Sequence, residues 1–251
     1  MKKIAIINQK GGVGKSTQST NIAYELACLG RKTLLADIDP QAHSCAVYMQ
    51  EQSIYTVKDL FSDPKFDTKQ AVFQGVSQGK SVNNLFVIPS NIQFAKVAEQ
   101  ISSRIHREKL LHNHLKKLDY DYVLLDCPPN LGVITINAIY TADLILIPVN
   151  YDKGALDGMA DLMSTIREVK ESTDLPYLIL RNAFDARNKQ TNSYIDSELE
   201  PFKDRLLKTK IRKTEAINQA RIADEPIQVY DPQSNGAADY KELIAELIQH
   251  V

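Results

Sequence analysis

A glycine-rich segment near the start of the chain carries residue types that bind phosphate. Residues 9–17 read Gln-Lys-Gly-Gly-Val-Gly-Lys-Ser-Thr, between an apolar run at 4–7 and a helical pattern at 16–29. A strand, a glycine-rich turn and a helix N-terminus together direct backbone N–H groups at an anion, and a lysine adds a full positive charge. The segment therefore predicts a cradle for the phosphates of a nucleotide. The predicted nucleotide contacts are Gly11, Gly12, Val13, Gly14, Lys15, Ser16 and Thr17, with Ser16 also a magnesium ligand.

The loop departs from the common phosphate-loop pattern. Gln9 stands where that pattern has glycine, and an additional lysine, Lys10, precedes Lys15 by five residues. Lys10 is either a solvated loop cation or a second phosphate contact. Because one loop can already wrap a triphosphate with Lys15, we favour a Lys10 that reaches a nucleotide held by another subunit.

Three aspartates lie at the ends of apolar runs that are predicted to be strands. Asp37 and Asp39 lie at the end of the run at 33–38, two residues apart, so an extended chain places both on one face. Beside a phosphate loop, such carboxylates hold magnesium through water or orient an attacking water; the alternative is a plain strand-end turn. Asp126 ends a later run and is followed by Pro-Pro-Asn-Leu-Gly after Cys127. We expect it to reach the water shell of magnesium opposite Ser16, with the stiff turn as a phosphate-sensing switch.

Asn182 closely follows the apolar run at 177–180. In phosphate-loop proteins a side chain at this place commonly contacts adenine, and an ordinary turn residue is the alternative. Asn182 is therefore the candidate contact to the base.

Residues 203–213 concentrate positive charge. Six of these eleven residues are basic, Asp204 is the one acid among them, and Arg221 follows in the next helical pattern. The stretch is either a solvated face or a surface that binds a phosphate backbone without reading bases, with steep salt dependence. The candidate contacts are Lys208, Lys210, Arg212, Lys213 and Arg221.

Composition sets the remaining bounds. The 251 residues are 43% hydrophobic with a net charge of −1, which allows a sizeable core and gives no global field for nucleic acid or an anionic membrane. Three cysteines without metal-site spacing indicate reduced thiols in a cytoplasmic protein. No signal peptide is visible, and no apolar run approaches the ~20 residues that span a bilayer.

Apolar runs alternate with helical patterns along the chain, which predicts an α/β fold. Several runs are apolar throughout, as in strands covered on both faces, so we expect a mostly parallel, twisted sheet with helices on both faces. The predicted strands are 4–7, 33–38, 85–88, 122–126, 144–149 and 177–180. The predicted helices are 16–29, 92–102, 107–118, 133–140 and 156–171, with a last helix ending the chain. The less regular residues 50–84 are expected to be a connection inside a single domain, 1–251.

The motifs together resemble one family. The string Lys-Gly-Gly-Val-Gly-Lys-Ser-Thr, the Asp-Cys-Pro-Pro turn at Asp126, and Pro-Ile followed by Tyr-Asp-Pro from Pro226 resemble the deviant-Walker ATPases of the ParA/MinD group, in particular its ParA/Soj branch. The resemblance extends from the first strand to the last helix. It implies a P-loop fold, ATP and Mg²⁺, hydrolysis to ADP and phosphate, an ATP-sandwich homodimer, binding to nonspecific double-stranded DNA, and a stimulating ParB-like partner. The implied role is plasmid or chromosome partition by a cytoplasmic, nucleoid-associated protein.

The resemblance also implies roles for individual residues. Lys10 would cross the dimer interface to the ATP of the partner, Asp39 would help to position the hydrolytic water, and Asp37 would lie in the outer shell of the metal. Asp152 would lie at the dimer face, with an acidic residue at a helix N-terminus as the alternative. Lys10, Lys15 and Asp39 are thus the candidate catalytic residues.

Two other functions would use the same loop. A MinD-like regulator of division-site placement, which cycles on membranes, needs a basic tail with an exposed apolar face. The last helix instead has Leu243, Ile244 and Leu247 at core spacing, beside Glu242 and Glu246. We therefore expect no membrane-targeting tail, no membrane partner and no N-terminal helix-turn-helix extension. A positioning ATPase for a non-DNA cargo would share the biochemistry, and only its cargo would distinguish it.

Overall fold

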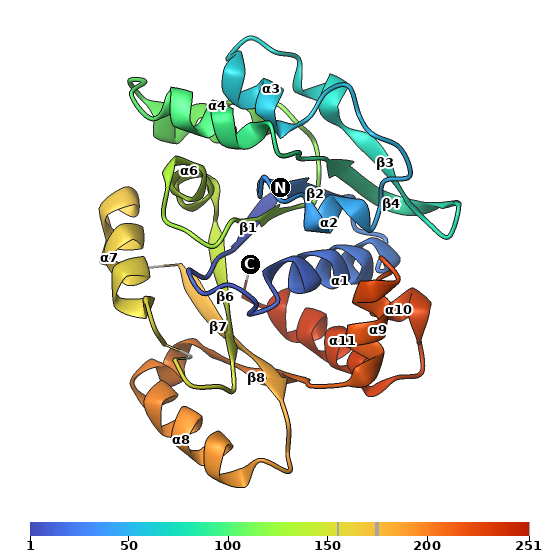
Figure 1. Cartoon of the computed structure of the whole chain (residues 1–251), viewed down its shortest axis with the longest axis vertical. Helices are drawn as coiled ribbons and strands as arrows, with labels where there is room; N and C mark the ends of the chain where they lie inside the picture. The colour runs from blue at the N-terminus through green and yellow to red at the C-terminus, as the bar shows by residue number, and fades with distance from the viewer. Residues whose placement is uncertain (155, 174–175, 251) are drawn as a thin grey trace.

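One sheet of eight strands runs through the part of the chain that the structure describes (Figure 1). The computed structural model describes residues 1–154, 156–173 and 176–250. The strand order is β3-β4-β2-β5-β1-β6-β7-β8, and neighbouring strands are parallel except β3 and β4. The strands are β1 Lys2–Ile6, β2 Thr33–Asp37, β3 Phe73–Ser77, β4 Lys80–Ile88, β5 Tyr122–Asp126, β6 Leu144–Asn150, β7 Tyr177–Phe184 and β8 Leu206–Arg212.

Helices cover both faces of the sheet (Figure 1). Helices α1, α9, α10 and α11 pack on one face, and helices α3 to α8 pack on the other. The α-helices are α1 Lys15–Cys28, α2 His43–Ala46, α3 Val57–Ser62, α4 Phe94–Ile101, α5 Leu110–Leu115, α6 Val133–Thr141, α7 Met159–Lys170, α8 Lys189–Leu199, α9 Glu215–Ile222, α10 Ile227–Tyr230 and α11 Asn235–Leu247. Three short 3₁₀ helices are η1 Thr68–Ala71, η2 Arg107–Lys109 and η3 Glu200–Arg205.

The central strands are apolar on both faces because each face contacts its own helical layer. In β1, Ile4 and Ile6 belong to the core beneath α1 and α11, whereas Ala5 belongs to the core beneath α6 and α7. Successive side chains of a strand point to opposite faces, so a continuous apolar run fills both cores. The predicted mostly parallel α/β sheet with two helical layers is confirmed.

Helix α11 buries its apolar face within the domain. Leu243 and Ile244 are fully buried, and Leu247 is 1% exposed. These side chains join the core that α1 also covers. Within the described residues, no helix combines the length and the apolar character needed to cross a bilayer.

Two strands were missed in the sequence. Residues 50–84 contain β3 and most of β4, which form an antiparallel edge hairpin rather than a loop connection. Gly75 makes the sequence of β3 resemble that of a loop. A Cβ added at Gly75 would lie 3.0 Å from the Leu85 side chain, so β3 and β4 approach closely there. The basic stretch forms β8, where Leu207 and Ile211 are buried and cationic side chains lie between them. Lysines are typical of such edge strands because charge discourages further pairing.

Candidate functional site

The strand order brings the predicted site residues to one end of the sheet. Strand β5 lies between β1 and β2, and Asp126 is the register partner of both Ile6 and Asp37. The loop that follows Ile6 therefore starts beside two strand-end aspartates. Parallel α/β sheets bind ligands at this carboxyl edge.

The phosphate loop joins β1 to α1 and contains two glycines with positive φ. Gly12 has a φ of 75° and Gly14 a φ of 88°, which residues with a Cβ rarely adopt. A Cβ on Gly14 would also lie 2.9 Å from Nδ2 of Asn182. Asn8, close to the end of β1, accepts a hydrogen bond from the Lys10 N–H at 2.9 Å. Sequence and packing thus fix the path of the loop.

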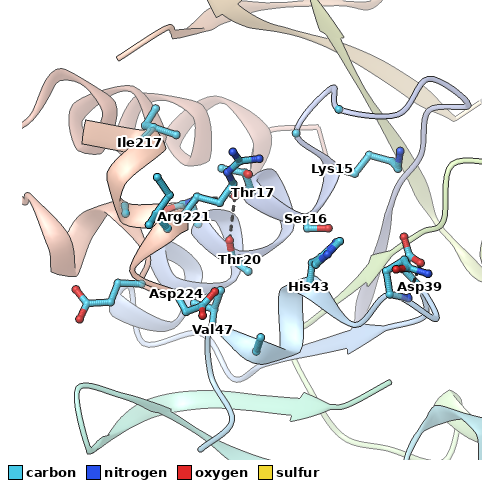
Figure 2. A pocket seen from close by; sticks show the side chains of 18 of the residues that line it. Lys15, Ser16, Thr17, Thr20, Asp39, His43, Val47, Ile217, Arg221 and Asp224 are labelled. Carbon is cyan, nitrogen blue, oxygen red and sulfur yellow. Dashed lines mark hydrogen bonds between the residues drawn. The ribbon is translucent and has the colours of Figure 1, made fainter. Parts of the chain in front are cut away.

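Lys15 begins α1 and faces the cavity under the loop. It is 7% exposed, and its Nζ donates to the Lys10 carbonyl at 3.2 Å. Burial lowers the pKa of Lys15, an effect opposed by the nearby carboxylate of Asp126. A buried ammonium at a helix N-terminus attracts an anion strongly. The cavity has a volume of about 580 Å³, and its lining includes Gly11, Gly12, Gly14, Lys15, Ser16, Thr17 and Asp39 (Figure 2).

Asp126 brings a buried carboxylate to the start of α1. Its Oδ1 accepts from the Ser19 hydroxyl at 3.0 Å, whereas its buried Oδ2 has no hydrogen-bond partner. Burial raises the pKa of Asp126 to about 6, and the Ser16 hydroxyl acts in the opposite direction. An orphaned carboxylate oxygen beside a hydroxyl is an oxygen donor set of the kind that magnesium prefers. The residues therefore fit a magnesium ion bound by Ser16, with Asp126 contacting its water shell.

Ser19 was not singled out in the sequence. It lies four residues after Lys15, one helical turn along α1, and its hydroxyl also donates to the Lys15 carbonyl at 2.9 Å. That spacing was the available signal, because it places Ser19 on the face of α1 that contains Lys15.

Asp37 and Asp39 have different surroundings. Asp37 is fully buried, and its oxygens accept from the backbone N–H groups of Asp39, Ser44 and Cys45 at 2.9–3.1 Å. Burial, and then repulsion by Asp126, raises the pKa of Asp37 to about 7. Asp37 thus holds the turn that follows β2, and its place in the outer metal shell stays a prediction. Asp39 lines the cavity, where its Oδ1 accepts a hydrogen bond from the Gln41 N–H at 2.9 Å.

Asn182 supports the phosphate loop from β7. Its Nδ2 donates to the Val13 carbonyl at 2.8 Å and to Asn150 Oδ1 at 3.0 Å, and its Oδ1 accepts from Gln18 at 3.1 Å. Asn182 also lines a second cavity of about 420 Å³, which shares Gly14 with the first. Its contact to a base stays a prediction. Asn150 was missed, although it is the polar residue that ends the apolar run at 144–149.

The side chain of Lys10 lies outside both cavities. Its Nζ donates to Asp152 Oδ1 and, at 2.9 Å, to the Lys153 carbonyl. Lys10 is not among the residues that line either cavity. The structure therefore brings together the two residues that were predicted for a dimer face, within one chain. Their place at an interface is still a prediction.

Comparisons with known proteins point to one family. Residues 1–177 match the profile of an AAA domain family. The chain is 36% identical over 251 residues to the sporulation initiation inhibitor protein Soj of Bacillus subtilis, covering 98% of each chain. The chain belongs to the Soj/ParA family of chromosome-partitioning ATPases. The ParA/Soj resemblance of the sequence is thus confirmed.

Two solved structures share the fold of this Soj/ParA protein. A Borrelia burgdorferi protein assigned to plasmid partition, bound to AMPPNP, superposes with a TM-score of 0.83 at 25% identity, covering 100% of this chain and 99% of that one. Cobyrinic acid a,c-diamide synthase of Mycobacterium smegmatis, with bound ATP analogue and magnesium, gives a TM-score of 0.81 at 26% identity, covering 100% and 95%. Neighbours of this fold therefore bind ATP analogues and magnesium.

Three candidate DNA contacts of this Soj/ParA chain are exposed. Lys208 lies on β8, Lys213 follows that strand, and Arg221 lies on α9. In Figure 2, Arg221 lies on α9 opposite Thr17 of α1, and it lines both cavities. Arg221 is thus close to the candidate nucleotide site and also to Arg212 and Lys213 at the end of β8.

The other two candidates are held in ion pairs. The Arg212 guanidinium donates from Nε to Asp239 Oδ1 at 2.9 Å, and the side chain of Asp239 is 4% exposed. Lys210 Nζ lies 3.5 Å from Asp196 Oδ2. Neither carboxylate is close in sequence to its partner, so the charge pattern of residues 203–213 could not reveal these pairs.

Proposed function

We propose that this chain is a magnesium-dependent ATPase that forms an ATP-sandwich dimer, binds DNA without sequence preference, and drives plasmid or chromosome partition with a ParB-like partner. One observation carries the proposal: the two lysines of the phosphate loop have different surroundings. Lys15 is buried and lines the cavity, whereas Lys10 lies against Asp152. A nucleotide in the cavity contacts Lys15, and Lys10 remains for a nucleotide held by a second copy of the chain.

The residues at the cavity divide the work of hydrolysis. Backbone N–H groups of the loop and the Lys15 ammonium hold the phosphates, and Thr17 supports the α-phosphate. Magnesium, when bound, neutralises phosphate charge; Ser16 and Asp126 would hold it. Asp39, which lines the same cavity, orients the attacking water with the acceptor capacity that remains beside its bond from the Gln41 N–H.

Dimerisation completes the site. Lys10 from the second subunit offsets negative charge that develops on the phosphates in the transition state, in the way that a positioned cation accelerates phosphoryl transfer. Lys10 must first leave Asp152 and the Lys153 carbonyl, so its pairing in the monomer keeps the isolated chain slow. Hydrolysis thus depends on the ATP-bound dimer.

DNA binding follows from the exposed cations. Lys208, Lys213 and Arg221 offer positive charge without a base-reading geometry, which suits contact with phosphates at any sequence. A dimer presents this surface twice and so raises avidity for DNA. ATP turnover then sets how long the protein stays on the nucleoid, and a ParB-like partner that stimulates turnover releases it.

The direct test is Lys10→Ala, with Lys153→Ala as the matched control. Lys153 is an adjacent exposed lysine whose backbone carbonyl, not its side chain, contacts Lys10. In light scattering with ATP and Mg²⁺, the wild type and Lys153→Ala should form dimers, and Lys10→Ala should stay monomeric while still binding one nucleotide. A full-strength dimer of Lys10→Ala would contradict the trans role of Lys10.

A further inference from the structure

The segment that ends β6 sends successive side chains to two different places. Asn150 donates to the Gly12 carbonyl at 3.4 Å, and Asp152 binds Lys10, so both contact the phosphate loop. Tyr151, between them, donates its hydroxyl to Asp196 on α8 at 2.6 Å. Tyr151 and Asp152 lie in the bend that follows the end of β6 at Asn150, and this bend directs their side chains apart. Three consecutive residues therefore connect the phosphate loop to the side of the sheet that contains α8 and β8.

Tyr151 belongs to a compact cluster at that side. Its ring lies against Phe184, with 5.2 Å between ring centroids, and Lys210 Nζ lies 4.5 Å from the Phe184 centroid and 5.4 Å from that of Tyr151. Asp196 accepts from Tyr151 and also pairs with Lys210 at 3.5 Å and with Arg181 at 3.8 Å. One carboxylate is therefore shared by a phenol and two cations.

The shared carboxylate limits how much positive charge the edge presents. Lys210 is on β8, two residues from Lys208, and Arg181 is its register partner on β7. While Asp196 pairs with both cations, their charge is partly neutralised; if Asp196 moves, the same edge gains attraction for phosphates. The Lys210 side chain is 24% exposed, so this cation is not freely solvated in the present arrangement, and its burial lowers its pKa.

At the other end of the segment, the Lys10 ammonium has two alternative sets of acceptors. The phosphates of a nucleotide on a partner subunit would compete with Asp152 and the Lys153 carbonyl for the Lys10 ammonium, because both sides offer negative acceptors. Departure of Lys10 removes the cation that Asp152 and the Lys153 carbonyl bind, and so frees the segment on which Tyr151 lies. A contact with two competing sets of acceptors, next to a shared carboxylate, is the kind of element that coupling between sites requires.

We propose that Tyr151 is a positioning residue that transmits the state of the Lys10–Asp152 contact to Asp196, and thereby sets how much positive charge Lys210 and Arg181 offer to DNA. The inference rests on the proposed ATP-dependent dimer and DNA binding. It adds a physical route between the two: ATP-driven release of Lys10 loosens Tyr151 and uncovers the cations of the β7–β8 edge.

The first experiment uses fluorescence and needs no DNA. The chain has no tryptophan, so Phe184→Trp is a single reporter beside Tyr151 and Lys210. Its emission should shift with ATP and Mg²⁺ and much less with ADP, and adding Tyr151→Phe should remove most of the ATP shift. An equal shift in both backgrounds, or no ATP shift at all, would overturn the proposal.

The second experiment measures DNA affinity with ATP and with ADP. Asp196→Asn and Tyr151→Phe should each lower the ATP-to-ADP affinity ratio by about 3-fold or more, mainly by strengthening binding with ADP. Glu200→Gln is the matched control: it removes one negative charge from the adjacent η3, where Glu200 pairs with exposed Lys203, and should leave the ratio unchanged. Unchanged ratios in both test variants would also overturn the proposal.

The two experiments separate the coupling from the function on which it rests. A wild type that binds DNA equally with ATP and ADP contradicts the proposed DNA cycle, and the fluorescence comparison still decides whether Tyr151 transmits the nucleotide state. ATP-dependent DNA binding that survives both Tyr151→Phe and Asp196→Asn supports the function and rejects this route.

Discussion

Two regions of the molecule concentrate charge but hold it in opposite ways. One is the phosphate corner, formed by the phosphate loop and Asp126, and the other is the edge strand β8. At the corner, Lys15 and Asp126 are buried, and Asp126 Oδ2 lacks a hydrogen-bond partner. At the edge, Arg212 and Lys210 are partly exposed, yet carboxylates from α11 and α8 pair with them. A buried carboxylate oxygen without a partner is costly, and beside the Ser16 hydroxyl it fits a cation, whereas a paired surface cation has a structural explanation. Charge density alone therefore does not identify a binding surface; the pairing of each charge does.

The largest expected effect comes from Asp126→Asn. Loss of the carboxylate weakens the hold on magnesium, and we expect ATP hydrolysis to fall at least ~100-fold, the scale of removing one strong electrostatic interaction with a transition state. Asp143→Asn is the control, since Asp143 pairs with Lys3 at 2.8 Å away from the cavity. Steady-state phosphate release measures both variants. A comparable loss of ATP hydrolysis in Asp143→Asn would show that the buried carboxylate of Asp126 has no particular role.

The second prediction separates the two groups of cations by stability. Arg212→Ala leaves the buried Asp239 carboxylate without its guanidinium and should cost about 1–3 kcal/mol of unfolding free energy. Lys213→Ala, one residue away and exposed, should change it by less than ~0.5 kcal/mol. Urea denaturation followed by circular dichroism gives both values. Equal losses would show that the Arg212–Asp239 pair contributes nothing of its own.

The third prediction separates the same groups by DNA binding. Lys213→Ala, combined with Lys208→Ala, should weaken binding at every DNA sequence and lower the slope of log affinity against log salt by about 1 for each phosphate that the protein no longer neutralises. Arg212→Lys keeps the charge and should leave that slope unchanged. Filter binding over a salt series is sufficient. An unchanged slope in the double variant would place the DNA surface elsewhere.

The smallest expected effect concerns pH. Burial raises the pKa of Asp126 to about 6, and burial together with Asp126 raises that of Asp37 to about 7, both above the values in an unfolded chain. The folded state thus binds protons more tightly, so unfolding free energy should rise as pH falls from about 7.5 to about 5.5 without magnesium. Asp126→Asn should flatten this rise. Magnesium and ATP should reverse the trend, because they favour the ionised carboxylate.

The sheet could be predicted from the sequence wherever strands are apolar throughout. All six predicted strands exist, since burial on both faces leaves an unmistakable run of apolar residues. The two missed strands, β3 and β8, lie at the edges of the sheet. Edge strands contact fewer apolar neighbours and tolerate glycine and lysine, so their local composition resembles that of loops.

Sequence by itself determined the phosphate loop. The positive φ of Gly12 and Gly14, the start of α1 and the placement of Lys15 are all set within a few consecutive residues, so a local pattern is enough to specify them. The position of Asp126 could also be predicted from the sequence, because a buried parallel strand that ends in an acidic residue places that residue at the carboxyl edge of the sheet.

Only the tertiary structure decided the partners of the cations. Lys10 binds a residue 142 positions away, and Arg212 binds one 27 positions away. Such pairs depend on which strands are neighbours and on how helices pack over them, and these are properties of the whole sheet. The sequence thus specified the candidate phosphate loop, and the fold specified which cations already have carboxylate partners.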